Sequence, residues 1–435
     1  MAMTRIRRIL KKNKQIEKLY RSYFYPLILR RRQHKRRIQE NKALSRIKNL
    51  KLKDSTIYFK NEGVTISISP FYNNYKGCLV ISSDFELNWG GRFSNSLNRD
   101  NYGFRTRLIF DHLIEILDLH NVPVTWATVG HLFLESCQKG NSLAHERMSR
   151  PTDFYKNKNW VYGNGDWYSH DPCTNLSLNP EWYGRDLIDK LLNANVNHEI
   201  GCHSFSHIDF SSKTTDAQLV DCEIKECIKL ANDLSIKLKS FVFPGNFEGH
   251  HDILCDYGFT SYRGYGGLDT VIYPEKKHGM WNIHQSLIIK PSDKDILKEV
   301  KIHFDSSVKN NGVCHLWFHP FELNQSFLED EFTSILDLIN EYRPNMWITT
   351  MEKLADYMEN RQNLQVQIVR SNDEIRINPQ VKLSSNFSKI PLTALVTFPP
   401  DFRIKARNGE KHDPLQERMI ELTSNTPITF SRIRN

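Results

Sequence analysis

The chain has 435 residues, of which 39% are hydrophobic and 11% aromatic, so it can bury a sizeable core and is not an intrinsically disordered protein. Its net charge of +9 is uneven, because residues 1–50 hold 17 Lys or Arg against two Glu, a net of +15, which leaves the rest of the chain at −6. No window approaches about 18 consecutive apolar residues, and the N-terminus lacks the apolar region and cleavage site of an export signal. We therefore expect neither a spanning helix nor export, and predict a cytoplasmic protein.

The basic N-terminal segment, residues 1–50, contains an aromatic and aliphatic patch at 22–29, directly before the basic run at 30–37. This pattern favours binding to an anionic membrane surface, which would place the protein peripherally at the inner face of the membrane. A solvated basic helix is the alternative. Nucleic acid ranks third as a partner, because nothing downstream resembles a base-reading module.

Residues 51–75 are predicted to form a β-hairpin, since two alternating runs, 55–59 and 64–69, flank a short turn. From 76 to 360, buried strands alternate with amphipathic helices. The helix expected at 105–120, for example, carries Ile109, Leu113, Ile116 and Leu117 on one face. Repeated β-then-α units predict an α/β fold, a distorted (β/α) barrel of parallel strands.

Residues 361–435 return to alternation with period two and predict a small β-rich C-terminal appendage without a catalytic signature. A role in binding or partner docking and a plain cover for the barrel are both open for it. The long segment 131–184 is expected to form a lid or a substrate wall. The eight cysteines show no CxxC pair and no regular spacing, which favours reduced thiols over a disulfide framework or a zinc ribbon.

Polar residues gather where the predicted strands end. They are Asp84 with Glu86, His203 with His207, and His315 with His319. A bare HxxxH is more often structural than metal-binding, but parallel strands of a barrel bring their carboxyl ends to one face, so these distant pairs should converge. Two histidines and one carboxylate leave a coordination position open, as in catalytic zinc sites, and the same set also suits iron.

Four motifs carry a family resemblance across residues 76–358. They are SSDFE (82–86), HSFSH (203–207), FPGN (243–246) and LWFHP (316–320). In type and order they resemble the motifs of the polysaccharide deacetylases, metal-dependent enzymes that remove acetyl groups from N-acetylated sugars in glycans. The resemblance implies that Asp84 is the catalytic base and His319 the general acid. It implies that Glu86, His203 and His207 bind a divalent metal, with zinc preferred.

Two positions depart from the family pattern. Phe85 separates two acids that are adjacent in the family, so Asp84 and Glu86 could exchange roles or both contact the metal. Gly245 replaces an arginine that orients the base, and Arg263 is the predicted substitute. Arg263 and Asn246 are expected at the substrate. Trp89 is expected either to stack on a sugar ring or simply to pack.

We therefore expect a metal-dependent hydrolase that removes N-acetyl groups from an amino-sugar glycan. The alternative, kept open by Phe85 and Gly245, is a catalytically silent glycan-binding protein on the same scaffold. The intact HSFSH and LWFHP motifs count against that alternative.

Overall fold

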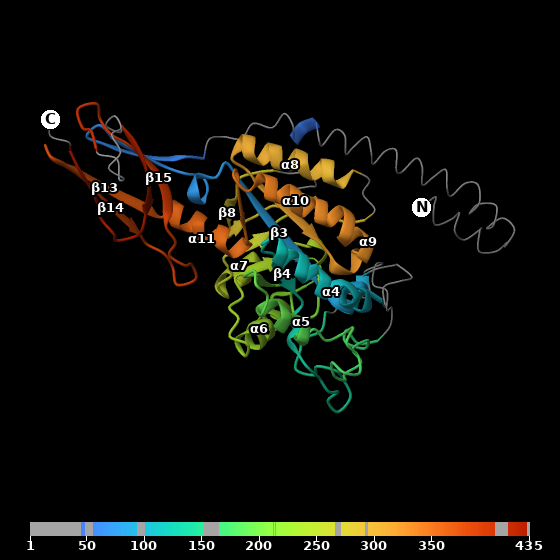
Figure 1. Ribbon diagram of the computed structural model, residues 1–435. Helices are drawn as coiled ribbons and strands as arrows, with labels where there is room; N and C mark the ends of the chain where they lie inside the picture. The colour runs from blue at the N-terminus through green and yellow to red at the C-terminus, as the bar shows by residue number, and fades with distance from the viewer. Residues whose placement is uncertain are drawn as a thin grey trace, which may run out of the picture. The chain divides into compact units, whose positions relative to one another are not determined.

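The computed structural model describes residues 45–47, 55–93, 101–151, 165–211, 213, 215–265, 271–291, 295–404 and 416–432. Apart from 45–47, the predicted basic segment 1–50 lies outside these residues, and so does its predicted membrane contact. Across the described ranges, no helix is both long and apolar enough to cross a bilayer. Figure 1 shows the helices α4 to α10 around strands β3 and β4, with β13 to β15 at the far end of α11.

The core of the fold is a ten-stranded sheet in the order β10-β11-β3-β4-β5-β6-β7-β9-β8, with β12 also pairing with β3. Every strand pair in it is parallel except β8 with β9. The strands are β3 (Gly77–Phe85), β4 (Thr125–Thr128), β5 (Glu199–Cys202), β6 (Ser240–Val242), β7 (Ser261–Arg263), β8 (Glu275–Lys277), β9 (Met280–Asn282), β10 (Leu287–Ile288), β11 (Val313–Phe318) and β12 (Met346–Thr349). The predicted distorted barrel of parallel strands is thereby confirmed.

Helices follow most of the parallel strands, as the alternating pattern predicts. They are α4 (Tyr102–Leu119), α5 (Arg185–Leu192), α6 (Ala217–Asn232), α7 (His251–Asp256), α8 (Ile296–Asn310), α9 (Gln325–Phe327), α10 (Thr333–Tyr342) and α11 (Met351–Gln362). The predicted apolar face of α4 is buried in full, at Ile109, Leu113, Ile116 and Leu117. Helix α6 begins where Asp216 accepts a hydrogen bond from the Leu219 N–H at 2.8 Å, an N-cap that satisfies a free backbone donor.

The β-rich part contains two further sheets. One has the order β1-β2-β15-β16 and the other β13-β14-β17. Their strands are β1 (Ile57–Asn61), β2 (Val64–Ile68), β13 (Leu364–Arg370), β14 (Glu374–Val381), β15 (Leu392–Thr397), β16 (Glu417–Leu422) and β17 (Ile428–Ser431). The predicted hairpin is present as β1 and β2, and β2 pairs antiparallel with β15. The lead-in and the appendage, which the sequence analysis separated, therefore share one sheet.

Strand β3 delivers the acidic motif because side chains alternate along it. Asp84 lies on the same face as Ser82, and Phe85 points the other way, into contact with Phe110 and Trp126 at ring-centroid distances of 5.5 and 5.7 Å. The neighbouring strands β4 and β11 pair in parallel with the last residues of β3, Ser82–Phe85 and Cys78–Ser83 respectively. The residues that follow β3, β4 and β11 therefore lie at the same edge of the sheet.

Candidate active site

Seven of the predicted site residues meet at the carboxyl ends of the strands, including His207 and Asn246 from the loops after β5 and β6. Asp84 and Glu86 come from the end of β3, His203 follows β5, Arg263 ends β7 and His319 follows β11. A pocket of about 270 Å³ opens here, and its lining includes Asp84, Glu86, His207, Asn246 and His319. Residues distant in sequence are brought to one place by strand topology alone.

The candidate metal ligands are Glu86, His203 and His207. The Nε2 atoms of both histidines lie 3.1 Å from the same oxygen, Oε1 of Glu86, and all three side chains are at most 5% exposed. Burial disfavours the ionised Glu86, but the two imidazoles outweigh it, so the pKa of this carboxyl lies well below its usual value. The three ligand atoms form one of the groups in the described chain that could hold an ion.

The tautomer of His203 indicates that this donor set fits a cation. Its Nδ1 lies 2.8 Å from the backbone carbonyl of Val242, which can only accept, so Nδ1 carries the proton. With that proton on Nδ1, an imidazole that carries no second proton would turn the lone pair of Nε2 toward the Glu86 carboxylate, which also can only accept. A divalent ion between these atoms removes the conflict, and the carbonyl contact is the outer-shell support that metal-binding histidines usually have.

The position of Glu86 depends on Gly90, one turn further along the chain. A Cβ atom at Gly90 would lie 1.6 Å from Oε2 of Glu86, so any side chain there would expel the carboxylate. Glu86 can therefore keep its position beside the two histidines only if residue 90 is glycine.

The loop that carries the two histidines is held in an unfavourable backbone conformation. Ser204 and His207 have φ values of 58°, in the left-handed region that costs non-glycine residues on the order of 1–3 kcal/mol each. Between them, Ser206 donates from its N–H and its hydroxyl to the buried Glu223 of α6, at 2.8 and 2.6 Å. These two hydrogen bonds to α6 therefore hold the loop in its conformation.

Asp84 is held by Arg263. The guanidinium contacts both carboxylate oxygens, at 2.6 and 2.8 Å, and also donates to the Ser82 hydroxyl at 3.0 Å. Burial raises the pKa of Asp84, but the charge and hydrogen bonds of Arg263 outweigh it, with help from His203 and His319, and the pKa lies below its usual value. Arg263 thus makes the contact with Asp84 that its predicted role, as the substitute for an arginine at position 245, requires.

An arginine at position 245 would be strained in this backbone. The φ of Gly245 is +61°, and a Cβ there would approach the ring of Phe247 to 2.8 Å. The guanidinium that contacts Asp84 comes instead from Arg263 on β7.

Removing the Arg263 guanidinium should strongly destabilise the fold. We expect Arg263→Ala to lower the free energy of unfolding by about 3–5 kcal/mol, because the ionised Asp84 would remain buried without its partner. Denaturant unfolding measures this. The matched control is Arg185→Ala, which breaks the half-exposed pair with Asp189 and should cost at most about 1 kcal/mol. Equal costs for the two variants would contradict the assignment.

His319 faces the two acids across the pocket. Its Nε2 lies 3.7 Å from Asp84 Oδ2 and 3.9 Å from Glu86 Oε1, and its Nδ1 lies 3.0 Å from Glu322 Oε2. Burial lowers its pKa, but the hydrogen bond with Glu322 and the charges of Glu86 and Asp84 prevail and raise it to about 9. The ring is therefore protonated at neutral pH and able to donate from Nε2.

Four predicted residues do not line the pocket: His203 and Arg263, which contact Glu86 and Asp84, and His315 and Trp89. His315 is buried and hydrogen-bonds to the Ser82 hydroxyl at 2.9 Å. Because Arg263 donates to the same hydroxyl, His315 helps to position Arg263 through Ser82. Trp89 is fully buried, donates to the Trp182 carbonyl at 3.3 Å and packs on His131, so the stacking role on a sugar ring is replaced by packing. An aromatic three residues after a ligand can point either way, and here the helical turn η3 (Leu87–Phe93) directs it inward.

Sequence reasoning missed two contributors, Glu322 and Phe247. Glu322 follows His319 by three residues in a 3-10 turn, η8 (Pro320–Glu322), and this spacing was its only signal. Phe247 lines the pocket and is 41% exposed, although nothing in its local pattern sets it apart from a core residue.

Comparison with known proteins gives structural neighbours only. No protein-family profile matches the chain, and no curated protein sequence matches it. Three similar solved structures are a putative polysaccharide deacetylase from Mycobacterium smegmatis, the allantoinase Puue, and a probable polysaccharide deacetylase from Pseudomonas aeruginosa PAO1. The first is 14% identical, with 70% of this chain and 98% of that chain covered and a TM-score of 0.44.

The other two are each 12% identical, with 66% of this chain and 92% of theirs covered and TM-scores of 0.44. In structure the chain is thus similar to solved polysaccharide deacetylases and to an allantoinase.

Proposed function

We propose that this protein is a metal-dependent hydrolase that removes N-acetyl groups from an amino-sugar glycan. The observation that carries the proposal is the division of labour between the two acids. Glu86 faces His203 and His207, whereas Asp84 is held by Arg263. His319 lies opposite both acids, within 4 Å of each. A ligand set, a base and an acid thus surround one small pocket.

Glu86, His203 and His207 would hold the ion, with zinc favoured by two imidazoles and one carboxylate. When bound, a divalent ion supplies Lewis acidity that polarises the amide carbonyl and lowers the pKa of water. Asp84 is assigned to proton transfer because Arg263 fixes its carboxylate at the pocket, and because it shares a ligand-type group with Glu86 and His319 but not with the two histidines.

In the proposed reaction, Asp84 accepts a proton from the attacking water as the water oxygen bonds to the carbonyl carbon of the N-acetyl group. The C–N bond then breaks while His319 donates its Nε2 proton to the departing nitrogen. The products are acetate and a free amine. Arg263 keeps the Asp84 carboxylate ionised and oriented, and Glu322 keeps His319 protonated between turnovers.

The pocket walls suit a sugar ring. Phe247 is exposed at the pocket, and Phe321 stacks on Tyr102 at a centroid distance of 3.8 Å. Asn246 lines the same pocket and adds an amide able to bond to hydroxyls. Aromatic faces with a few polar groups are typical of sites for small polar ligands.

Truncating Phe247 should weaken substrate binding with little effect on the chemical step. We expect Phe247→Ala to raise KM by about tenfold, the loss of about 1.4 kcal/mol of ring contact, and to leave kcat within about twofold. Steady-state kinetics on an N-acetylated oligosaccharide measure both. The control is Phe104→Ala, an exposed phenylalanine of α4 outside the pocket, which should change neither. A fall in kcat alone would remove Phe247 from the binding surface.

The experiment that tests the proposal quantifies acetate and free amine from N-acetylated amino-sugar oligosaccharides, with wild type and His319→Gln. Wild type should release both products in equal amounts, and the variant should bind the same sugars with little release. Binding without release by the metal-loaded wild type would instead favour the catalytically silent glycan-binding protein.

A further inference from the structure

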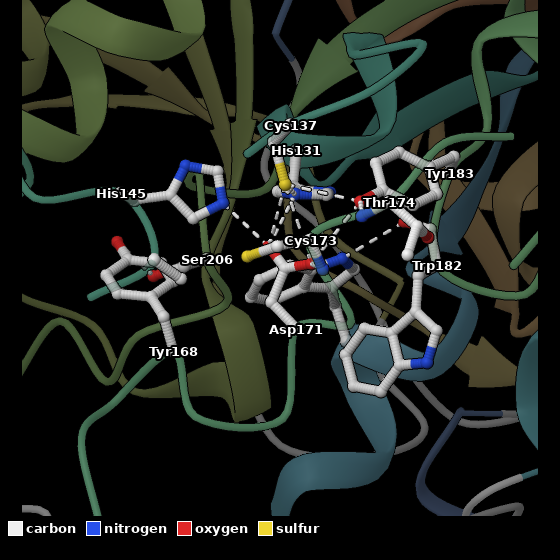
Figure 2. A network of polar contacts seen from close by, with 12 residues as sticks. His131, Cys137, His145, Tyr168, Asp171, Cys173, Thr174, Trp182, Tyr183 and Ser206 are labelled. Atoms are coloured by element: carbon white, nitrogen blue, oxygen red, sulfur yellow. Dashed lines mark hydrogen bonds and ion pairs between the residues drawn. The ribbon is translucent and has the colours of Figure 1, made fainter. Parts of the chain in front are cut away.

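A second group of ligand-type side chains lies outside the candidate active site. His131, Cys137, His145 and Asp171 each place one ligand atom within 4.8 Å of all the others. Figure 2 shows them pointing toward one another, and all four belong to the segment between β4 and α5. His131 and Asp171 are fully buried and the side chain of His145 is 10% exposed, so water does not solvate this cluster freely.

The cluster repeats the geometry of the first site. Two imidazole Nε2 atoms converge on one carboxylate oxygen, with His131 at 2.9 Å and His145 at 2.6 Å from Oδ2 of Asp171. At the first site the corresponding distances to Oε1 of Glu86 are both 3.1 Å. The difference is the added thiol of Cys137, whose Sγ lies 3.4 Å from the same Asp171 oxygen and 3.8 Å from His131 Nε2.

The other oxygen of Asp171 is already occupied by protein donors. Oδ1 accepts from the Cys173 backbone N–H at 2.9 Å, and the Tyr183 hydroxyl lies 3.5 Å away. That hydroxyl also lies 3.2 Å from Cys137 Sγ and accepts from the Thr174 N–H at 2.9 Å. These contacts fix Asp171 so that Oδ2 faces the two histidines, as outer-shell contacts do around metal ligands.

The same geometry rules out a nucleophilic Cys–His–Asp triad. In such a triad the histidine uses one ring nitrogen for the nucleophile and the other for the carboxylate. Here a single nitrogen, Nε2 of His131, faces both the thiol and Asp171.

We propose that His131, Cys137, His145 and Asp171 bind a structural zinc ion. Four protein ligands of nitrogen, sulfur and oxygen type make a closed tetrahedral set, the mark of structural rather than catalytic zinc. The thiolate makes zinc a better match than magnesium or calcium, which take oxygen ligands. On binding, Cys137 would release its thiol proton, and the ion would offset the charges of the resulting thiolate and of Asp171.

Such an ion would brace the loop of the first site. The His131 N–H donates to the Phe205 carbonyl at 3.0 Å, and the Gly130 N–H donates to the Ser204 carbonyl at 2.7 Å. Further along the same segment, Trp167 Nε1 donates to the Ser206 hydroxyl at 2.8 Å. Residues 204–206, between the two candidate ligands of the first site, thus rest directly on the segment that this second ion would hold.

The test uses the full chain, loaded with Zn²⁺ and dialysed, and separately with Co²⁺. Elemental analysis should find two zinc ions per chain in the wild type. The cobalt form should show the near-ultraviolet charge-transfer absorption of a cobalt–thiolate bond, which the first site cannot give because it has no cysteine. Both this absorption and one zinc ion should survive in His203→Ala. A single wild-type zinc ion, lost in His203→Ala, with no thiolate absorption, would overturn the proposal.

The ligand assignment is tested by a pair of neighbouring cysteines. Cys137→Ser should lose the thiolate absorption and one zinc ion and lower the thermal unfolding midpoint. Cys173→Ser is the matched control and should keep the absorption and both ions, because the Cys173 thiol, although it contacts Cys137 and Asp171, is not one of the four converging ligand atoms. If Cys173→Ser abolishes the absorption and Cys137→Ser keeps it, the assignment of Cys137 is wrong. If Cys137→Ser fails to fold, the cobalt spectrum of the wild type still shows whether a thiolate binds the metal.

Discussion

His203→Ala is expected to abolish metal binding at the candidate active site and, with it, turnover. Nε2 of His203 is one of three converging ligand atoms, and its ring is fixed by the Val242 carbonyl, so no neighbour can take its place. Loss of an outer-shell partner alone typically costs 10–100-fold in metal affinity, and loss of a direct ligand should cost more than about 100-fold.

Elemental analysis after dialysis should therefore show one metal ion fewer per chain than in the wild type. The control is His112→Ala, which removes a half-buried histidine of α4 that contacts Glu115 and lies in none of the ligand groups. That variant should keep the full metal content. A His203→Ala protein that also keeps it would show that HSFSH does not bind metal here.

The second large effect separates the roles of the two acids. Asp84→Asn should retain the metal and lose about 10²–10⁴-fold in kcat, the usual contribution of a general base. Glu86→Gln should instead release the metal, because Glu86 Oε1 is the oxygen that both histidines face.

Both substitutions preserve side-chain shape, so comparison of the two variants isolates the charge. Metal content and single-turnover acetate release should be measured on the same preparations. Loss of metal from Asp84→Asn with retention in Glu86→Gln would exchange the two roles. Unchanged acetate release in both variants would remove the acids from the mechanism.

The barrel and its edge were predictable because they depend on local patterns and one topological rule. The buried run of β3 and the amphipathic α4 can be read from short windows. Parallel pairing then forces Asp84, His203 and His319 to one edge without further information. Arg263 could be suggested for the same reason, since it ends a strand of that sheet.

Other features depend on contacts that no short window records. The pairing of β2 with β15 joins segments near opposite ends of the chain, and alternation predicts each strand but not its partner. Trp89 could have faced either the pocket or the core. Its contacts with His131 and Trp182, at centroid distances of 4.4 and 5.5 Å, place it in the core.

The second ligand cluster could not be predicted from the sequence for a related reason. His131, Cys137, His145 and Asp171 have irregular spacing and lie in a segment with little regular secondary structure. No helical or strand period relates them, so sequence patterns for zinc sites do not apply. The segment is predicted as a lid or a substrate wall, and its Trp167, Tyr168 and Asp171 are buried.

The most direct test of the central claim measures acetate release from an N-acetylated amino-sugar oligosaccharide by one preparation in three states. These are the metal-loaded protein, the protein stripped by a chelator, and the stripped protein after addition of one zinc equivalent for each candidate site. Metal-dependent amide hydrolysis predicts release in the first state, none in the second and recovery in the third. Release that continues in protein shown by elemental analysis to be metal-free would contradict the account.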